Sequence, residues 1–217
     1  MTLVMATIED SLTTPDRLLA GAERLVVREG VRALTVRRIA EEAGVNSALV
    51  RYHFGDTDGL LGELALRNAA RLADARSELL EAMTPGDFAQ AVDALIVPLW
   101  ARAAMNQRYR AIVVLDEIFA RSGQDLNARI WAVFADGVAR VQSALEACLP
   151  GVDPHALAWR IRFVTAAALD IPPRGLPDGR EGVRTAYGRD SDEERLAQFR
   201  RFASDALRMD KSDCSGS

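Results

Sequence analysis

Residues 35 to 61 read TVRRIAEEAGVNSALVRYHFGDTDGLL, and this stretch decides the fold of the N-terminal region. Thr35 stands where a side-chain N-cap is expected, and apolar residues follow it at helical spacing. Gly44 occupies a helix-stop position, because glycine enters the left-handed conformation without steric cost. Asn46 can then cap a second helix. The pattern predicts a helix-turn-helix at about residues 35–54, whose second helix is suited to the DNA major groove.

This stretch resembles the N-terminal domain of the tetracycline-repressor (TetR) family. The resemblance rests on five short runs in a fixed order: Leu34-Thr35-Val36, Ile39-Ala40, Ala43-Gly44-Val45, Tyr52-His53-Phe54-Gly55 and Leu60-Leu61. It covers about residues 12–72, the first third of the chain. The resemblance implies a DNA-binding domain of three helices, followed by a helical domain for ligand binding and dimerisation.

One position departs from the family pattern. Two residues after Gly55 the family usually carries a lysine that meets a DNA phosphate, whereas this chain has Thr57 between Asp56 and Asp58. Thr57 can cap a helix or donate a hydrogen bond to a phosphate, but it supplies no positive charge. The departure puts tight phosphate binding at this corner in doubt.

The composition is that of an ordinary globular protein. The 217 residues are 49% hydrophobic and 27% charged, and no apolar run approaches the ~20 residues that a membrane span requires. The N-terminus lacks the pattern of a signal peptide, and the chain has two cysteines, Cys148 and Cys214, far apart in sequence. We therefore expect a cytoplasmic protein without structural disulfides and without a membrane partner. The net charge of −4 argues only mildly against nucleic-acid binding, because local charge placement matters more than the total.

The rest of the chain predicts further helices and no strands, so the fold class is all-α. Residues 73–209 form the expected effector-binding and dimerisation domain, with a break near Val97 because Pro98 cannot donate a backbone hydrogen bond. Residues 171–191 are rich in proline and glycine and predict a flexible loop, and residues 210–217 predict a polar tail. The last two helices, roughly 154–170 and 191–209, are expected to form the homodimer interface, through stripes that include Leu157, Ile161 and Val164, and Leu196, Phe199 and Phe202.

Several residues around the turn are candidates for contact with double-stranded DNA. Arg37 matches a family position that can reach a base edge, and a phosphate contact is the alternative. Arg51 should face outward on the second helix, where contact with bases and with the DNA backbone are equally plausible. Of Tyr52 and His53, one is expected to pack on the domain and the other to lie against phosphate. The full set is Thr35, Arg37, Arg38, Asn46, Ser47, Ala48, Arg51, Tyr52, His53 and Thr57.

The resemblance also implies an effector pocket in the C-terminal domain. The expected ligand is a small apolar or amphipathic molecule, because such pockets are mostly apolar with few polar groups. The candidate lining residues are Trp100, Tyr109, Asp116, Phe119, Trp131 and Phe134. Asp116 falls on an apolar face of the predicted helix from Tyr109 to Arg121, so it should either pair with an arginine such as Arg102 or Arg160 or anchor the ligand.

No catalytic constellation, cofactor motif or metal-ligand spacing appears in the sequence, so we expect neither an enzyme nor a cofactor or metal requirement. The favoured interpretation is a homodimeric, sequence-specific regulator that binds a palindromic operator, most often as a repressor released by its effector. The alternative is a helical ligand-binding protein or enzyme on the same fold, with weak or lost DNA binding.

Overall fold

The computed structural model of the protein describes residues 12–107, 109–169 and 191–209. Within these ranges the regular elements are all helices, and the one strand-like feature is an isolated antiparallel bridge between Arg102 and Arg110. The all-α prediction is therefore confirmed. The predicted tail at 210–217 and nearly all of the predicted loop at 171–191 lie outside the described residues.

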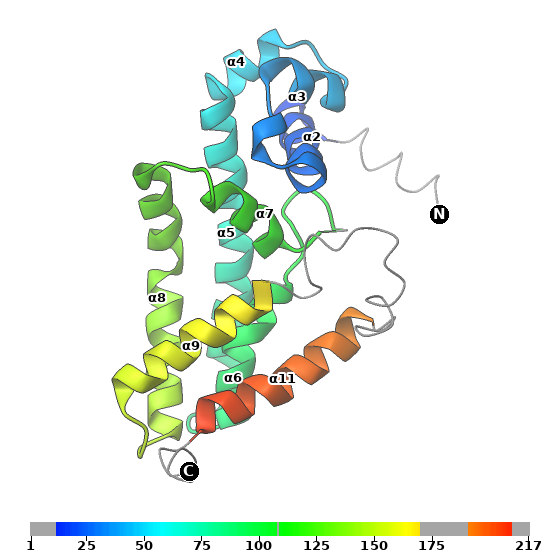
Figure 1. Cartoon of the computed structure of the whole chain (residues 1–217). Coiled ribbons are helices and arrows are strands. Elements are labelled where there is room, and N and C mark those ends of the chain that lie inside the picture. The colour runs from blue at the N-terminus through cyan, green and yellow to red at the C-terminus, as the bar shows by residue number, and fades with distance from the viewer. Residues whose placement is uncertain (1–11, 108, 170–190, 210–217) are drawn as a thin grey trace, which may run out of the picture. The chain divides into compact units, whose positions relative to one another are not determined.

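The helices follow one another along the chain in the order shown in Figure 1. Their bounds are α2 Thr14–Glu29, η1 Val31–Ala33, α3 Val36–Ala43, α4 Ala48–Phe54, α5 Thr57–Ala82, α6 Phe88–Ile96, η2 Val97–Trp100, α7 Ala111–Phe119, α8 Gln124–Cys148, α9 Pro154–Leu169 and α11 Asp192–Arg208.

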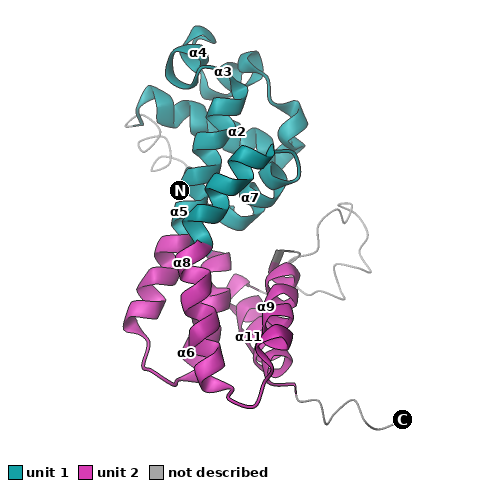
Figure 2. Cartoon of the chain, turned by 90° about the vertical axis from the view of Figure 1, so that its left-hand side faces the viewer, with its two compact units in different colours: residues 1–72, 101–134 teal, residues 73–100, 135–217 magenta. Residues whose placement is uncertain are grey.

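The chain divides into two compact units, each built from two separate parts of the sequence (Figure 2). Unit 1 contains residues 1–72 and 101–134, and unit 2 contains residues 73–100 and 135–217. Unit 1 therefore holds α7 in addition to the helices of the predicted N-terminal domain.

Helix α2 is the central element of unit 1, because it packs against α3, α4 and α7. The helix carries an apolar stripe toward these neighbours: Leu18, Leu19, Leu25 and Val26 are all buried. Burial of such a stripe removes apolar surface from water, which is the main driving force for helix packing. Thr13 caps the helix by accepting a hydrogen bond from the Asp16 amide.

In unit 2, the predicted break at Pro98 is confirmed, and a buried arginine compensates for it. Helix α6 ends at Ile96 and continues as the 3₁₀ turn η2. Pro98 has no amide hydrogen to donate to the carbonyl of Ala94, four residues earlier. Arg76 donates from Nε to the Ala94 carbonyl at 3.2 Å and from Nη2 to the Leu95 carbonyl at 3.4 Å. The sequence pattern had not singled out Arg76 on α5, although its side chain is buried.

Helices α9 and α11 pack on each other and on α6 within unit 2. Ser191 and Glu194 form a capping box that begins α11. Arg200 on α11 pairs with Asp93 on α6 at 2.7 Å, and the Phe199 ring packs against Trp100 with 5.5 Å between centroids.

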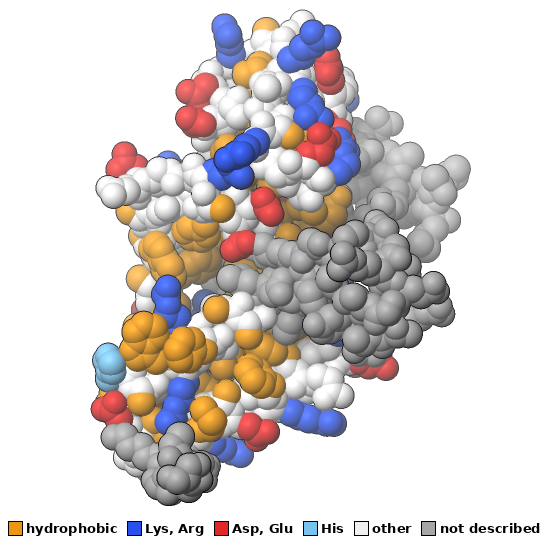
Figure 3. All heavy atoms as spheres, in the orientation of Figure 1, with side chains coloured by type: hydrophobic (Ala, Val, Ile, Leu, Met, Phe, Trp, Pro, Cys, Tyr) orange, Lys and Arg blue, Asp and Glu red, His pale blue; other side chains and the backbone are white. Residues whose placement is uncertain are grey.

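The stripes predicted for the dimer interface need a correction. Leu157, Val164 and Phe199 are buried inside the unit, because they form its own core. The large apolar side chains that stay exposed on these two helices are Trp159 at 48%, Phe163 at 63% and Phe202 at 53%. Apolar side chains gather over α9 and α11 on the face shown in Figure 3.

Helix α7 differs from the predicted helix over Tyr109 to Arg121. It is shorter, and its buried positions are Ala111, Val114, Leu115 and Ile118. Tyr109 precedes the helix, where its carbonyl accepts a hydrogen bond from the Ala103 amide at 2.9 Å. The assumed face through Asp116 was therefore wrong, because the helix turns a neighbouring face to the core and leaves Asp116 half-buried.

Candidate nucleic-acid interface

The turn between α3 and α4 has the geometry that the sequence predicts. The Thr35 hydroxyl accepts a hydrogen bond from the Arg38 amide at 3.2 Å and so caps α3. Gly44 ends α3 with φ 66° and ψ 38°, a left-handed conformation that side chains with a Cβ rarely adopt. Asn46 Oδ1 then accepts from the Ala48 amide at 2.8 Å at the start of α4. Both predicted capping roles are confirmed, and the turn fixes the direction of α4.

Helix α4 presents one apolar residue inward and several polar or small residues outward. Val50 is fully buried, whereas Ser47, Ala48, Arg51 and His53 are exposed. Tyr52 is 81% exposed, and its ring meets that of His53 edge-on with 4.9 Å between centroids. Neither ring of this pair is buried in the domain, so the expected division between a packed and a phosphate-facing ring is not seen here. Both side chains are available to a partner on the outer surface.

Arg51 has no ion-pair partner in the part of the chain that the structure describes, and it is exposed. A guanidinium of this kind keeps all five of its donors available for a partner. Arginine pairs in two-pronged fashion with phosphate or with the O6 and N7 atoms of guanine. Arg51 is thus the side chain on α4 best suited to an anionic or base-edge contact.

Helix α2 holds α3 by close backbone approach and by hydrogen bonds to its C-terminal end. A Cβ atom on Gly21 would lie 3.2 Å from the Ala43 amide nitrogen, so glycine lets the two helices approach closely. Arg17 donates from Nη2 to the carbonyls of Ala43 at 3.0 Å and Gly44 at 3.3 Å. These bonds satisfy carbonyls that the end of a helix leaves without partners.

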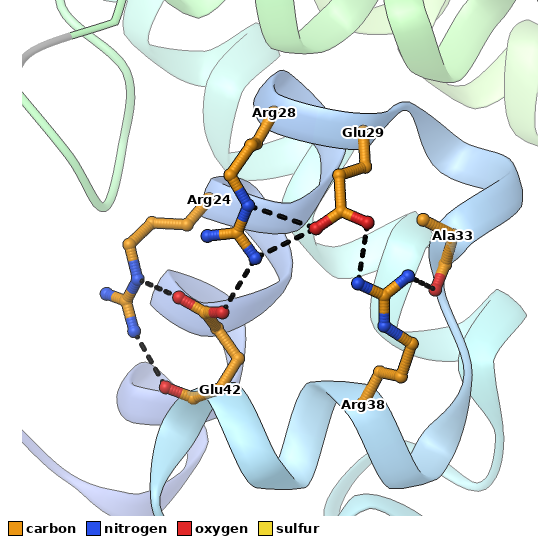
Figure 4. A network of polar contacts seen from close by, with 6 residues as sticks. All are labelled: Arg24, Arg28, Glu29, Ala33, Arg38 and Glu42. Atoms are coloured by element: carbon orange, nitrogen blue, oxygen red, sulfur yellow. Dashed lines mark hydrogen bonds and ion pairs between the residues drawn. The ribbon is translucent and has the colours of Figure 1, made fainter.

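A network of ion pairs fastens the same two helices (Figure 4). Glu42 on α3 accepts from two arginines of α2, Arg24 at 2.8 Å and Arg28 at 3.0 Å. Glu29 on α2 pairs with Arg28 at 2.9 Å and with Arg38 of α3 at 2.6 Å. We call these five side chains the α2–α3 ion-pair network.

The network sets two carboxylates against three guanidinium groups, so most of its positive charge is compensated within the unit. Hydrogen bonds from Arg38 and Arg28 lower the pKa of Glu29, and those from Arg28 and Arg24 lower the pKa of Glu42. Both carboxylates are therefore ionised at neutral pH and occupy the arginines beside them. Arg38, predicted as a DNA contact, also donates to the Ala33 carbonyl at 3.3 Å, so its guanidinium is already engaged within the unit.

Arg37 occupies an intermediate position among these arginines. It pairs with Glu41 one helical turn away at 2.7 Å, but the two side chains are 86% and 59% exposed. Exposed pairs of this kind contribute little to stability and exchange readily with water or with another partner. Arg37 therefore remains free to turn toward a ligand.

The start of α5 differs from the predicted cap. Asp56 Oδ1 accepts from the Gly59 amide at 2.8 Å, so Asp56 caps the helix. Thr57, which the sequence also allowed as the cap, is the first residue of α5 and is half-buried. The carboxylates of Asp56 and Asp58 on either side of it are exposed. This corner carries negative charge where the family resemblance implies a cation.

The predicted effector residues separate into two groups. In unit 1, Trp131 lies between Phe119 and Phe134, with ring centroids 6.1 Å and 6.2 Å apart, and Trp131 is 57% exposed. Tyr109 and Asp116 belong to the same unit, and both are half-buried. Trp100 belongs to unit 2, where it packs on Phe199.

The structure reveals a buried polar cluster in unit 1 that the sequence prediction missed. Glu23 on α2 and Asn68 on α5 are both fully buried. Glu23 follows Leu19 by four residues and precedes Val26 by three, so it falls on the same apolar stripe of the helix. A carboxylate at such a position is a signal that sequence reading can find.

Within the described ranges, no group of three or more His, Cys, Asp or Glu side chains lies close enough together to hold a metal ion. None of the helices described combines the length and the apolar character that crossing a lipid bilayer requires.

The interface is similar in sequence to a described family of proteins. Residues 18–64 match the family "Bacterial regulatory proteins, tetR family". Over 81 residues the chain is 36% identical to the "HTH-type transcriptional repressor AcnR" of Corynebacterium efficiens, in an alignment that covers 36% of this chain and 43% of that protein. The chain thus spans less than half the length of this relative.

Two longer similarities extend beyond the interface. Over 163 residues the chain is 28% identical to the "HTH-type transcriptional regulator HbdR" of Aromatoleum sp. (strain CIB), covering 70% of this chain and 68% of that protein. The crystal structure of the TetR family transcriptional regulator PfmR from Thermus thermophilus has the same fold, with a TM-score of 0.65 and 20% identity over 88% of this chain and 97% of that one. The second similarity concerns the fold alone.

Proposed function

We propose that the chain is a member of the tetR family of bacterial regulatory proteins and that it is a sequence-specific DNA-binding transcriptional regulator. The observation that carries the proposal is the outer face of α4, on which exposed polar side chains follow the left-handed turn at Gly44. An α-helix of this kind fits the major groove, where each base pair presents a distinct pattern of donors and acceptors.

The exposed residues have different proposed roles. Arg51 contacts a base edge or a phosphate, and Ser47, Ala48, Tyr52 and His53 complete the contact surface of α4. Arg37 reaches DNA by exchanging its partner Glu41, whereas Thr35 and Asn46 act mainly by capping the two helices. Arg38 supports the interface from within the α2–α3 ion-pair network, and Thr57 is at most a neutral phosphate contact.

We further propose a homodimer in which the exposed aromatic face of α9 and α11 meets a second copy. The face carries Trp159, Phe163 and Phe202, and monomeric proteins rarely leave large contiguous apolar patches exposed. Two copies related by a twofold axis would bind a palindromic operator, with half-sites about one helical turn (~34 Å) or a multiple of it apart.

Repression and release by an effector complete the proposal. The relative AcnR is described as a repressor, which supports the same direction of regulation here. The effector would be a small apolar or amphipathic molecule bound in unit 1, near Tyr109, Asp116, Phe119, Trp131 and Phe134. It would shift the protein toward a state with lower affinity for DNA, through its own differential affinity for the two states.

Selection of bound sequences from random double-stranded DNA tests the proposed function. We expect enrichment of a palindrome, and binding of that palindrome in a mobility-shift assay at matched salt. If no sequence is enriched while the folded protein binds small ligands, the alternative of a ligand-binding protein without DNA recognition is correct.

The dimer face has its own test. Phe163→Arg places a charge on the exposed aromatic face, whereas Ala139→Arg places the same charge on an exposed position of α8. Light scattering should show a dimer for the wild type and for Ala139→Arg, and a monomer for Phe163→Arg. A wild-type monomer at micromolar concentration would contradict the proposal.

The proposed effector site is tested at Asp116. Asp116→Asn keeps the shape of the side chain and removes its charge. If Asp116 contacts the effector, DNA binding and the melting temperature should persist while release by the effector weakens. A sharp fall in melting temperature without a change in release would show a structural ion-pair partner instead.

A further inference from the structure

A buried polar cluster joins three segments of unit 1. Asn68 on α5 donates from Nδ2 to Glu23 Oε1 on α2 at 3.2 Å and to its own helix at the Leu64 carbonyl at 3.0 Å. The third segment is the connection from η2 to α7, residues 101–110, in which Arg102 and Arg110 form an isolated antiparallel bridge. We call this segment the bridged connection.

The bridged connection is bound through its backbone. The Ala104 amide donates to Asn68 Oδ1 at 3.1 Å, and the Met105 amide donates to Glu23 Oε1 at 3.3 Å. Consecutive amides of the connection therefore point at one side chain of α5 and one of α2. Loss of either acceptor would leave an amide in or near the core without its partner, which is costly.

Glu23 is incompletely satisfied in this cluster. Its Oε1 accepts hydrogen bonds from Asn68 and Met105, whereas its buried Oε2 has no partner among the described residues. A carboxylate that bears a charge there loses hydration without full compensation. A neutral carboxyl group removes that charge, while its Oε1 can still accept from Asn68 and Met105.

The protonation equilibrium of Glu23 also favours the neutral carboxyl group. Burial raises the pKa of Glu23 above its ordinary value, and this outweighs the opposing hydrogen bonds from Asn68, Met105 and Asn106 and the nearby charge of Arg24. Arg67, next to Asn68, is already paired with Asp16 and Glu63. Other charged groups also lie on the elements packed around α2. They are Arg32 on η1, Arg37, Arg38, Glu41 and Glu42 on α3, Arg51 and His53 on α4, Arg102 and Arg110 on the bridged connection, and Asp116 and Glu117 on α7.

Helix α2 uses two different faces for its contacts with this buried cluster and for its contacts with the helix-turn-helix. Arg17, Gly21 and Arg24 recur at intervals of four and three residues and hold α3 and its turn. Asp16 and Glu23, seven residues apart, share another face and meet α5 and the bridged connection. A change in the contacts of Glu23 therefore acts on the same rigid helix that supports the DNA-contacting turn.

We propose that Glu23 and Asn68 are positioning residues for DNA recognition. Their hydrogen bonds hold the bridged connection against α2, and these contacts are most stable when the Glu23 carboxyl group is neutral. This inference rests on the proposed DNA binding. It makes the affinity for DNA depend on proton uptake at a side chain that does not touch DNA. A partner or condition that favours the ionised carboxylate would loosen the connection and weaken the support of α3.

The sign of the effect follows from the direction of the pKa shift. A carboxyl group whose pKa is raised on folding contributes stability below its ordinary pKa of 4.5 and loses that contribution as the pH rises through the folded pKa. The contact between Glu23 and the bridged connection should therefore weaken as the pH rises through the folded pKa of Glu23. Glu23→Gln should behave as the neutral form at every pH, because its amide oxygen can replace Oε1.

The experiment follows the carboxyl carbon of Glu23 and the amide of Met105 by NMR during a pH titration of the full-length protein. In the wild type, both signals should shift together in one transition above pH 4.5. In Glu23→Gln the Met105 transition should disappear, whereas in Glu41→Gln, an exposed matched control, it should remain. A Glu23 transition at or below pH 4.5, or a Met105 signal that does not follow that transition, would contradict the proposed contact. The wild-type titration alone decides this, even if a variant fails to fold.

A second measurement separates this inference from the proposed function. DNA affinity is measured across the same pH window for the wild type and for Glu23→Gln, at matched salt. We expect the wild-type affinity to fall several-fold as Glu23 ionises and the variant to lose most of that dependence. Equal pH dependence of DNA affinity in both proteins would contradict the positioning role. Absence of DNA binding at every pH would contradict the proposed function, and the contact between Glu23 and the bridged connection would then be judged by the NMR titration alone.

Discussion

Helices α3 and α4 lie on either side of one glycine turn, yet their arginines have opposite surroundings. Arg38 on α3 is engaged by Glu29 and by the Ala33 carbonyl, within the α2–α3 ion-pair network. Arg51 on α4 is exposed and has no ion-pair partner in the described part of the chain. The role of a basic residue near a helix-turn-helix therefore depends on its partners, because a guanidinium already bound to a carboxylate has fewer donors left for DNA.

The largest effect is expected on DNA binding when the free arginine of α4 is removed. Arg51→Ala should weaken binding of the selected operator by about 1–3 kcal/mol, the range for one base contact, and leave the melting temperature unchanged. Titrations at matched salt and thermal melting measure the two quantities. Wild-type affinity in this variant would remove Arg51 from the interface.

The next effect concerns the network that holds α3. Glu42→Gln should lower the free energy of unfolding by about 1 kcal/mol at neutral pH, a modest loss because Arg28 remains half in solvent and screening weakens the pairs. The low pKa of Glu42 gives a second signature: its contribution is present above the unfolded value of 4.5 and is lost as the pH falls through the folded pKa. The two proteins should therefore converge in stability in acid, and a difference independent of pH would contradict the assignment.

A smaller effect should follow from adding a cation beside α4. Thr57→Lys supplies the charge that this corner lacks, so affinity for any DNA sequence should rise and the salt dependence should steepen by about one phosphate contact. Thr57→Val is the matched control without a charge. An unchanged salt slope would show that the start of α5 does not approach phosphate.

The smallest effect is expected at Arg37, whose exposed pair with Glu41 can exchange. Arg37→Ala should leave thermal melting unchanged and reduce operator affinity less than Arg51→Ala does. Comparison of the two variants in one binding assay ranks the contributions of α3 and α4. A larger loss at Arg37 would move the main contact to α3.

The sequence was sufficient to predict those parts of the fold that depend on local chemistry. Thr35, Gly44 and Asn46 act through bonds within a few residues, and each has the predicted role. The break at Pro98 also follows from a local property, the missing amide hydrogen. What the sequence could not show is that Arg76, on the preceding helix α5, would supply the missing donors.

Assignments that depend on packing between distant segments were less accurate. The apolar-stripe argument selected Asp116, but α7 begins later than predicted and turns another face inward. The same argument applied to α2 would have selected Glu23, which is fully buried. Similarly, Leu157 and Val164 form a plausible stripe, yet they serve the core of their own unit and leave Trp159 and Phe163 outside. Periodicity shows that a helix has an apolar face but does not show which neighbour covers it.

The most direct test of the contrast between α3 and α4 is the base preference of Arg51→Ala and Arg38→Ala, measured by selection from random DNA. The account predicts that Arg51→Ala loses preference at one position of each half-site, whereas Arg38→Ala keeps the wild-type preference and binds all sequences more weakly in proportion to its loss of stability. Altered preference in Arg38→Ala together with an unchanged profile in Arg51→Ala would contradict the account.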